Sequence, residues 1–265
     1  MSEAALETVN LARRFGELVA VDSVNFTVPY GTVFGLLGPN GAGKSTTIKM
    51  LTTLLAPTAG TGRVAGFDIV RESFQVRKVI GYVPQLLSAD GNLTAYENLL
   101  IFAKMYGIPR SERKDRIMEV LGFMGLADAA RTLVNRFSGG MVRRLEIAQS
   151  MLHRPEVLFL DEPTIGLDPV ARKGVWEHIR RLRAEFGTTI LLTTHYMEEA
   201  DELCQCVAIM HLGRIVTLGA PDEIKAAAGV ATLDEAFTHY TGSSIRDGGT
   251  FRDAARVRRV ARRMG

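Results

Sequence analysis

The chain has 265 residues, of which 46% are hydrophobic, and its formal net charge at pH 7 is +3. That length and apolar content allow one large core or two interlocked ones, which excludes a small domain that depends on disulfides for its stability. The longest apolar stretches are far shorter than the roughly 18 residues of a membrane-spanning helix, so any membrane association is expected through a partner or a surface.

The N-terminal residues are acidic and small, not basic and then apolar, so no signal peptide is expected. Only two cysteines are present, Cys204 and Cys206. No further Cys or His pair lies near them at metal-binding spacing, so we interpret them as small buried side chains. This sparing use of cysteine fits a reducing cytosol.

The first unit of strand, loop and helix is predicted within residues 19–60. Residues 19–28 mix β-branched and polar side chains in rough alternation, and the apolar residues 33–37 predict a buried strand. A glycine-rich loop follows directly. Residues 46–55 then place apolar side chains at helical spacing, and Pro57 and Gly60 end the pattern.

The glycine-rich loop matches the phosphate-binding pattern G-x-x-x-x-G-K-[ST] between a predicted strand and a predicted helix. Glycines let backbone N–H groups approach phosphate oxygens, and the helix N-terminus favours a bound anion. In this pattern Lys44 reaches the β and γ phosphates and Ser45 offers its hydroxyl to Mg²⁺. The predicted ATP-binding residues of the loop are Gly38, Pro39, Asn40, Gly41, Ala42, Gly43, Lys44, Ser45 and Thr46.

Residues 92–125 predict helices without strands, because apolar side chains recur three and four positions apart. From Val157 the pattern alternates between strand and helix, which predicts a mainly parallel sheet with helices on its faces. The expected elements are a strand at 157–160, a helix at 169–186, a strand at 188–194, a helix at 197–203 and strands at 207–210 and 215–218.

Two carboxylates, Asp161 and Glu162, follow the apolar run that begins at Val157. An apolar strand that ends in Asp-Glu is common, but here it accompanies a phosphate loop. We therefore expect Asp161 to bind Mg²⁺ through water, and Glu162 to orient and deprotonate the attacking water as the catalytic base.

Residues 137–141, Phe-Ser-Gly-Gly-Met, resemble the LSGGQ signature of ATP-binding cassette (ABC) ATPases, and the resemblance extends to about Gly219. It implies an α/β P-loop NTPase fold with a RecA-like, mainly parallel sheet, an N-terminal antiparallel β portion and an inserted α-helical subdomain. The implied boundaries are residues 1–86 and 151–220 for the ATPase core, 87–150 for the helical signature subdomain, and 221–265 for a C-terminal extension with a basic tail.

The same resemblance assigns roles to residues outside the phosphate loop. Phe15 is similar to the aromatic residue that stacks on adenine, and Gln85 to the glutamine that reaches Mg²⁺. Asp168 is similar to the D-loop aspartate, and His195 to the switch histidine that contacts the γ-phosphate. The expected catalytic residues are therefore Lys44, Glu162 and His195. The expected Mg²⁺ ligands are Ser45, Gln85 and Asp161. In this family the signature covers the ATP of a second subunit, which brings Ser138, Gly139, Gly140 and Met141 to that nucleotide.

Two positions depart from the general signature: Met141 replaces Gln and Phe137 replaces Leu. The lost amide removes a polar contact near the partner's nucleotide, but Glu162 and His195 are retained, so we expect an active enzyme. The Met-ending signature followed by Arg143 and Arg144, with residues 94–98 and 194–199, resembles the branch that contains drug and antibiotic efflux ATPases of the daunorubicin-resistance type. The transported substrate is not encoded here, because the membrane partner selects it.

The resemblance implies that two identical or similar chains, a homodimer first of all, sandwich two ATP and drive a separately encoded transmembrane permease. The chain is then expected at the cytoplasmic face of the cell membrane, held peripherally through that permease. A soluble ABC ATPase that acts on nucleic acid or ribosomes is the alternative, but neither an inserted coiled coil or zinc module nor a second cassette is present. A P-loop kinase or GTPase leaves the signature unexplained, and the guanine-reading N-K-x-D string is absent.

The positive charge is concentrated at the end of the chain, where residues 242–265 contain seven Arg and two Asp. The remainder therefore has a net charge of −2, which argues against nucleic acid as a partner of the main body. Thr250 and Asp253 resemble a helix capping box, and the arginines after them fall along one helical face beside an apolar stripe. The leading interpretation of this tail is a frayed, solvated terminus, and a contact to anionic lipid or to the permease is the alternative.

Overall fold

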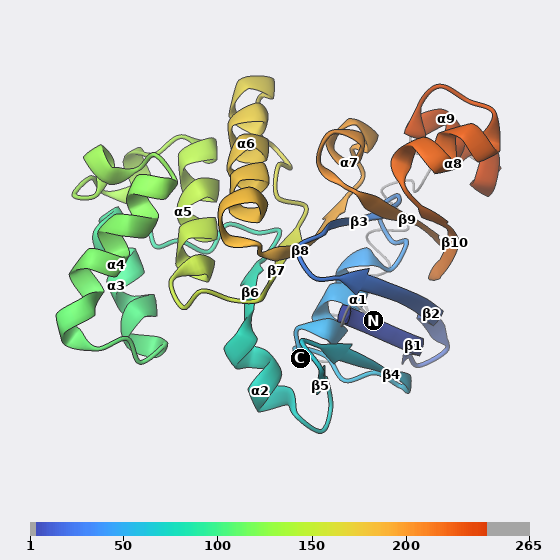
Figure 1. Cartoon of the computed structure of the whole chain (residues 1–265), viewed down its shortest axis with the longest axis horizontal. Coiled ribbons are helices and arrows are strands. Elements are labelled where there is room, and N and C mark those ends of the chain that lie inside the picture. The colour runs from blue at the N-terminus through green and yellow to red at the C-terminus, as the bar shows by residue number, and fades with distance from the viewer. Residues whose placement is uncertain (1–3, 243–265) are drawn as a thin grey trace.

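The computed structural model describes residues 4–242, so the basic helix predicted after Thr250 lies outside the described residues. The larger of its two sheets has the strand order β10-β9-β3-β8-β7-β6, and all its neighbouring strands are parallel except β10 and β9 (Figure 1). This confirms the predicted mainly parallel sheet. The strands are β3 (Val33–Leu37), β6 (Ile80–Val83), β7 (Val157–Asp161), β8 (Thr189–Thr194), β9 (Cys206–His211) and β10 (Arg214–Gly219).

The smaller sheet is antiparallel and has the order β2-β1-β4-β5, which confirms the expected antiparallel portion near the N-terminus. Phe26 of β2 stacks on Phe34 of β3 with the ring centroids 5.0 Å apart, so the two sheets pack against each other. The strands are β1 (Ala4–Phe15), β2 (Leu18–Pro29), β4 (Ala59–Val64) and β5 (Phe67–Asp68).

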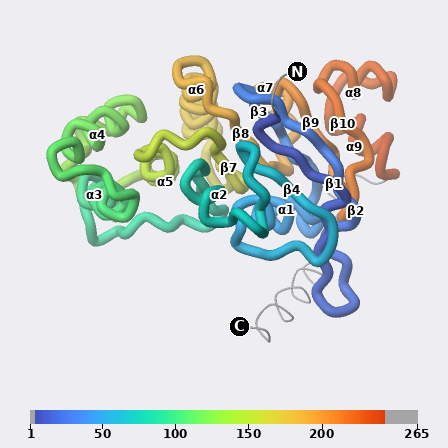
Figure 2. The backbone as a smooth tube through the Cα atoms, turned by 60° about the horizontal axis from the view of Figure 1, so that its bottom comes forward, coloured from blue at the N-terminus to red at the C-terminus, as the bar shows by residue number. Residues whose placement is uncertain are grey.

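Helices flank the larger sheet, and two of them have the bounds that the sequence predicts (Figures 1 and 2). The C-terminal pair α8 and α9 was not predicted; it is held by the buried side chains Ile224 and Phe237. The elements are α1 (Lys44–Leu51), α2 (Ser73–Val79), α6 (Pro169–Phe186), α7 (Met197–Leu203), α8 (Pro221–Ala228) and α9 (Leu233–Thr241).

The helix α1 differs from its predicted range of 46–55 at both ends. It begins at Lys44, because the phosphate loop itself leads into the first turn with Gly43 as the preceding residue. It ends at Leu51, because Thr53 adopts a left-handed backbone conformation with φ 63° that cannot continue a right-handed helix. The side chain of Lys44 therefore projects from the first helical position.

Three α-helices and two short 3-10 helices, at Ala127–Ala129 and Val134–Arg136, lie between β6 and β7. We call residues 95–151 the helical segment, which has these α-helices as its main elements. These are α3 (Ala95–Met105), α4 (Arg110–Phe123) and α5 (Gly139–Met151). Thr94 and Glu97 form a capping box at the start of α3, and Ser138 caps α5. The segment lies at one end of the molecule (Figure 1), and the predicted helices without strands over 92–125 are confirmed.

Side chains of β3 show how the sheet is covered on both faces. Val33 and Leu37 join one apolar core with side chains of α5, α6 and α7, whereas Phe34 and Leu36 join a second core with α1 and the smaller sheet. All five residues of β3 are buried. A strand that is buried on both faces requires a continuous apolar run, which is the pattern of residues 33–37.

Over residues 4–242, no helix combines the length and the apolar character that crossing a bilayer requires. Cys204 is buried and Cys206 is half-buried, and both are free thiols. Burial raises the pKa of the Cys204 thiol, so this side chain behaves as a small apolar group. Within the same residues no three His, Cys, Asp or Glu side chains are grouped as metal ligands.

Candidate active site

The phosphate loop connects the carboxyl end of β3 to α1, and its backbone lies against neighbouring strands. A Cβ atom on Gly38 would lie 2.2 Å from the carbonyl oxygen of Met210 in β9. At Gly43, where φ is 108°, it would lie 2.6 Å from the carbonyl oxygen of Ala20 in β2. Both distances are too short for any side chain. Glycine is therefore required here so that the loop can keep its N–H groups turned inward.

The Lys44 ammonium is buried at the centre of this loop. Its Nζ donates hydrogen bonds to the carbonyl oxygens of Gly38, at 2.7 Å, and Pro39, at 3.1 Å. It also lies 3.3 Å from Oε1 of Glu162. Burial lowers the pKa of Lys44, although the nearby Glu162 and Asp161 carboxylates oppose that shift. The Lys44 cation is thus held beside the phosphate loop by two backbone carbonyl oxygens and one carboxylate.

Asp161 ends β7 beside two hydroxyl groups that come from other elements. Ser45 Oγ donates to Asp161 Oδ1 at 2.9 Å, and Thr193 Oγ1 donates to the same oxygen at 2.6 Å. The register of the parallel sheet pairs Asp161 with Thr193 directly. Thr193 was not predicted as a site residue, because its only signal in the sequence is its place at the end of the strand before His195.

The oxygen atoms of Ser45 and Asp161 fit a Mg²⁺ ion in their chemistry. Hydroxyl and carboxylate oxygens are the ligands that Mg²⁺ prefers, and this ion commonly binds through only one or two carboxylates together with phosphate oxygens and water. The 2.9 Å separation of the two side chains places both at one point beside the loop. The expected third ligand, Gln85, contacts Glu162 instead.

Three side chains from separate parts of the fold converge on the buried Glu162 carboxylate. Lys44 lies near Oε1, whereas Gln85 Nε2 donates to Oε2 at 3.3 Å and His195 Nδ1 lies 3.2 Å from Oε2. Gln85 follows β6 and His195 follows β8, so the parallel strands bring both residues to the same edge as Glu162. The site thus brings together four residues, of which the first, Lys44, and the last, His195, are 151 positions apart in the sequence.

The surroundings of Glu162 favour its ionised form. Burial by itself raises the pKa of this carboxyl, but the His195 and Lys44 nitrogens outweigh burial and hold the pKa below its usual value. Glu162 also has a φ of 49°, a left-handed conformation that is costly for a side chain and concentrates at functional sites. Its backbone N–H donates to Thr193 Oγ1 at 3.0 Å. The carboxylate is therefore held as a fixed hydrogen-bond acceptor.

The signature residues occupy the first turn of α5, apart from α1 in both views (Figures 1 and 2). Ser138 is exposed and its Oγ accepts a hydrogen bond from the Met141 backbone N–H at 3.3 Å. Gly140 is packed so closely that an added Cβ would lie 2.9 Å from Cβ of Ala171 in α6. The Met141 side chain is half-buried and packs against the apolar core, where a glutamine amide would be less favourable.

Phe15 lies at the end of β1, opposite Leu18 across the β1–β2 turn. Its ring is half-buried and stacks with the Arg13 guanidinium, whose central carbon lies 4.6 Å from the ring centroid. The hairpin continues to Ala20, which contacts the phosphate loop at Gly43. Phe15 therefore belongs to the β1–β2 hairpin that lies against the phosphate loop.

Asp168 caps α6. Its Oδ1 accepts hydrogen bonds from the backbone N–H groups of Val170, at 3.0 Å, and Ala171, at 2.9 Å. The polar contacts of this carboxylate are thus with its own helix.

Two substitutions at Asp168 separate its capping contact from any role in catalysis. Asp168→Ala is expected to destabilise the chain by about 1 kcal/mol, or about 2–4 °C in Tm, because it removes the N-cap of α6. Asp168→Asn preserves the cap and should melt with the wild type in a thermal denaturation experiment. A loss of ATPase activity in Asp168→Asn without a loss of Tm would show that the carboxylate acts beyond capping.

Comparisons with known proteins agree with this geometry. A family model described as ABC transporter matches residues 21–165. The daunorubicin/doxorubicin resistance ATP-binding protein DrrA of Streptomyces peucetius is 45% identical over 86% of this chain and 69% of its own length. The Nod factor export ATP-binding protein I of Paraburkholderia xenovorans is 44% identical over 86% of this chain and 74% of its own.

A solved structure of an ATP-binding subunit of an ABC transporter superposes with a TM-score of 0.78 at 31% identity, covering 89% of this chain and 99% of the other. The family model spans the phosphate loop, Gln85, the signature and the Asp161–Glu162 pair, whereas His195 lies beyond its end. The chain therefore belongs to the ABC transporter family, as one of its ATP-hydrolysing subunits.

Proposed function

We propose that this chain powers an exporter whose transmembrane permease is a separate protein. The observation that carries the proposal is the convergence of Lys44, Gln85 and His195 on the ionised Glu162 carboxylate. A carboxylate held in this way can orient a water molecule and accept its proton. The fold brings three polar side chains from separate elements to one buried acid, which is the arrangement that a catalytic base requires.

In this proposal the phosphate loop binds ATP through its backbone N–H groups and Lys44. A Mg²⁺ ion held by Ser45 and Asp161, with Gln85 nearby, would neutralise phosphate charge. Glu162 takes the proton from the attacking water, and His195 contacts the γ-phosphate.

The exposed start of α5 supports a shared site between two chains. Ser138 is exposed at a helix N-terminus, where N–H groups and a hydroxyl can bind the phosphates of a nucleotide held by a partner. Two copies arranged about a two-fold axis would then sandwich two ATP. Phe15 would stack on adenine, and Asp168 would lie near the dimer contact.

The proposed permease contact lies on the helical segment and the loop before it. Leu86, Leu87 and Met105 expose 81%, 57% and 73% of their surface. Large apolar side chains at this exposure indicate an interaction surface. We place the ATPase core at residues 1–86 and 151–220, the helical subdomain at 87–150 and an extension at 221–265. The subunit would sit at the cytoplasmic face of the membrane through this contact.

The direction and class of transport come from the relatives. The curated proteins named above are described by drug resistance and by Nod factor export. Their identities of 44–45% over most of this chain support an exporter of drug-like or lipid-like amphipathic compounds.

The proposal predicts Mg²⁺-dependent ATP hydrolysis that requires two chains. The specific activity of the purified chain should increase with protein concentration from nanomolar to micromolar, because each site needs Ser138 from a second copy. Excess EDTA should abolish the activity, and restored Mg²⁺ should recover it. A specific activity that stays constant across this concentration range, with a monomer mass in the presence of ATP, would contradict the shared site.

A further inference from the structure

The loop that carries Gln85 is attached to the signature helix by two buried charges. We call residues 84–90, between β6 and α3, the Q-loop segment. Arg143 of α5 donates from Nη1 to the Pro84 carbonyl oxygen at 2.8 Å and from Nη2 to the Gln85 carbonyl oxygen at 2.9 Å. Glu146, one turn further along α5, accepts two hydrogen bonds from Ser88. One comes from the Ser88 backbone N–H and the other, at 3.2 Å, from the Ser88 hydroxyl.

Arg143 and Glu146 also pair with each other, with Nη1 3.0 Å from Oε2. Their residues are only 1% and 3% exposed. A buried ion pair contributes little net stability compared with apolar side chains of the same size. The distinctive property of this pair is therefore its set of partners. Each charge is bonded both to the other charge and to the backbone of the Q-loop segment.

The far end of the Q-loop segment is fixed in the same way. The Asp90 backbone N–H donates to Asn98 Oδ1 at 3.0 Å, and Gln149 Nε2 of α5 donates to the same oxygen at 3.3 Å. Asn98 and Gln149 are both buried. From Pro84 to Asp90 the segment is thus bonded to side chains of the helical segment.

The helix α5 links the Q-loop segment to the signature residue Ser138 and, through Gln85, to Glu162. Ser138 caps α5 and is exposed for a partner's nucleotide, and Arg143 lies on the same helix five residues later. The side chain of Gln85, whose carbonyl Arg143 holds, donates to Glu162 at 3.3 Å. A continuous path therefore runs from the signature, through α5 and Arg143, to the proposed catalytic base.

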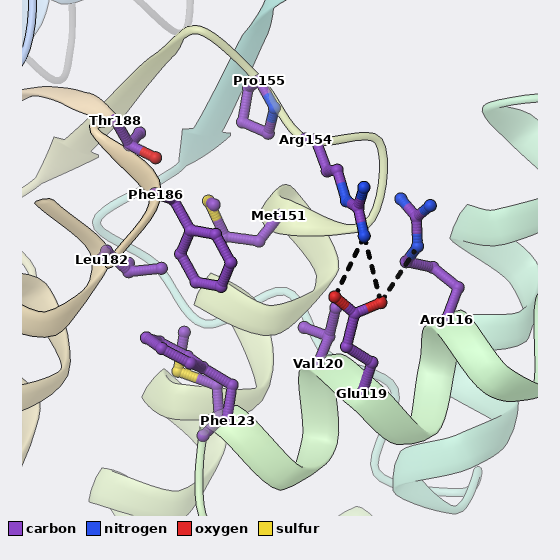
Figure 3. A pocket seen from close by; sticks show the side chains of 11 residues that line it. Arg116, Glu119, Val120, Phe123, Met151, Arg154, Pro155, Leu182, Phe186 and Thr188 are labelled. Carbon is purple, nitrogen blue, oxygen red and sulfur yellow. Dashed lines mark hydrogen bonds and ion pairs between the residues drawn. The ribbon is translucent and has the colours of Figure 1, made fainter. Parts of the chain in front are cut away.

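A second contact between the helical segment and the rest of the chain surrounds a pocket. A cavity of about 150 Å³ lies between α4 and α6, lined mainly by apolar side chains that include Val120, Phe123 and Phe186 (Figure 3). At its rim Glu119 pairs with Arg116 and Arg154. The ion pairs at this contact are thus partly exposed, whereas the Arg143–Glu146 pair is buried.

We propose that Arg143 and Glu146 are positioning residues that clamp the Q-loop segment to the signature helix. Movement of Ser138 onto the partner's nucleotide then moves Gln85 relative to Glu162, so closure of one site alters the catalytic base of the other. This inference rests on the proposed function, because it requires a dimer in which the signature closes a shared site.

Arg143→Lys tests the clamp with the charge pair preserved. A lysine ammonium can pair with Glu146 but cannot span both carbonyl oxygens as the planar guanidinium does. Arg144→Lys is the matched control, because Arg144 lies on the same helix and donates to the Met124 carbonyl oxygen at 2.9 Å, within the helical segment and not in the Q-loop segment.

Hydrogen exchange of the full chain gives the first measurement. The backbone amides of residues 85–90, that of Ser88 in particular, should exchange about 10-fold faster in Arg143→Lys, because fewer hydrogen bonds have to break when the segment opens locally. They should be unchanged in Arg144→Lys. If Arg143→Lys folds poorly, Glu146→Gln weakens the Ser88 contact without changing side-chain size and should give the same shift. Unchanged exchange in a folded clamp variant would overturn the proposal.

Steady-state ATP hydrolysis gives the second measurement. Arg143→Lys should lower kcat about 10-fold with a change in KM for ATP of less than about 2-fold, because ATP binding is untouched and only positioning is lost. In a Gln85→Ala background the same substitution should have little further effect on kcat. Full additivity of the two substitutions would overturn the proposal. Hydrogen exchange needs no turnover, so a failure of the clamp remains distinguishable from a failure of the proposed function.

Discussion

Glu162→Gln is expected to lower the rate of ATP hydrolysis by about 10²-fold or more while ATP binding is retained. Glutamine has nearly the same size, so the loops around it can keep their positions, but its amide cannot accept a proton from water. Lys44 retains its bonds to the Gly38 and Pro39 carbonyl oxygens in this variant. The protein should therefore accumulate as an ATP-bound dimer.

Steady-state ATPase rates, nucleotide affinity and mass in the presence of ATP together check this result. Glu156→Gln is the matched control, because Glu156 is exposed just before β7, at the opposite end of that strand from Glu162. It should hydrolyse ATP at the wild-type rate. A Glu162→Gln variant that did the same would remove Glu162 from the catalytic role.

Mixing two inactive variants is expected to restore activity. Lys44→Ala disables the phosphate loop of its own chain, and Ser138→Asp places a negative charge against the nucleotide of the partner. Aspartate also caps helices well, so α5 should remain intact in this variant. In a mixed dimer one site carries both defects and the other carries neither. Equal mixing should therefore recover about a quarter of the wild-type activity if dimers form at random and intact sites act independently.

A second mixture controls for non-specific rescue. Lys44→Ala with Glu162→Gln places both defects in the residues that each chain supplies to its own nucleotide, so every mixed dimer has two damaged sites. This mixture should stay inactive. If the Lys44→Ala and Ser138→Asp mixture also regained nothing, while both variants dimerise with wild-type chains, the shared site would be wrong.

Several elements could be predicted because their signals are local in the sequence. The bounds of α6 match the prediction, since Asp168 caps its start, Pro169 occupies the first turn, and Gly187 adopts the left-handed φ of 65° that ends a helix. The strand β3 follows from its continuous apolar run. The phosphate loop follows from its pattern, since the required backbone conformations restrict the residue types directly.

Other elements depend on partners that lie far away along the chain. The strand β4, with the sequence AGTGRV, has little strand character of its own and is held by its pairing with β1. The helices α8 and α9 are fixed by the burial of side chains such as Phe237. The helix α1 also ends earlier than its apolar spacing indicates, because Thr53 adopts a left-handed backbone conformation that the spacing does not encode.

The sequence by itself therefore determined the class of fold, the family resemblance and the chemical type of the site, because these are written in short motifs. Only the tertiary structure decided that Gln85, His195 and Lys44 meet at Glu162, that Thr193 shares Asp161 with Ser45, and that Arg143 and Glu146 bond the Q-loop segment to α5. Each of these contacts joins residues from separate strands, loops or helices. Their distances are set by the order and register of parallel strands and by helix packing, which no local pattern specifies.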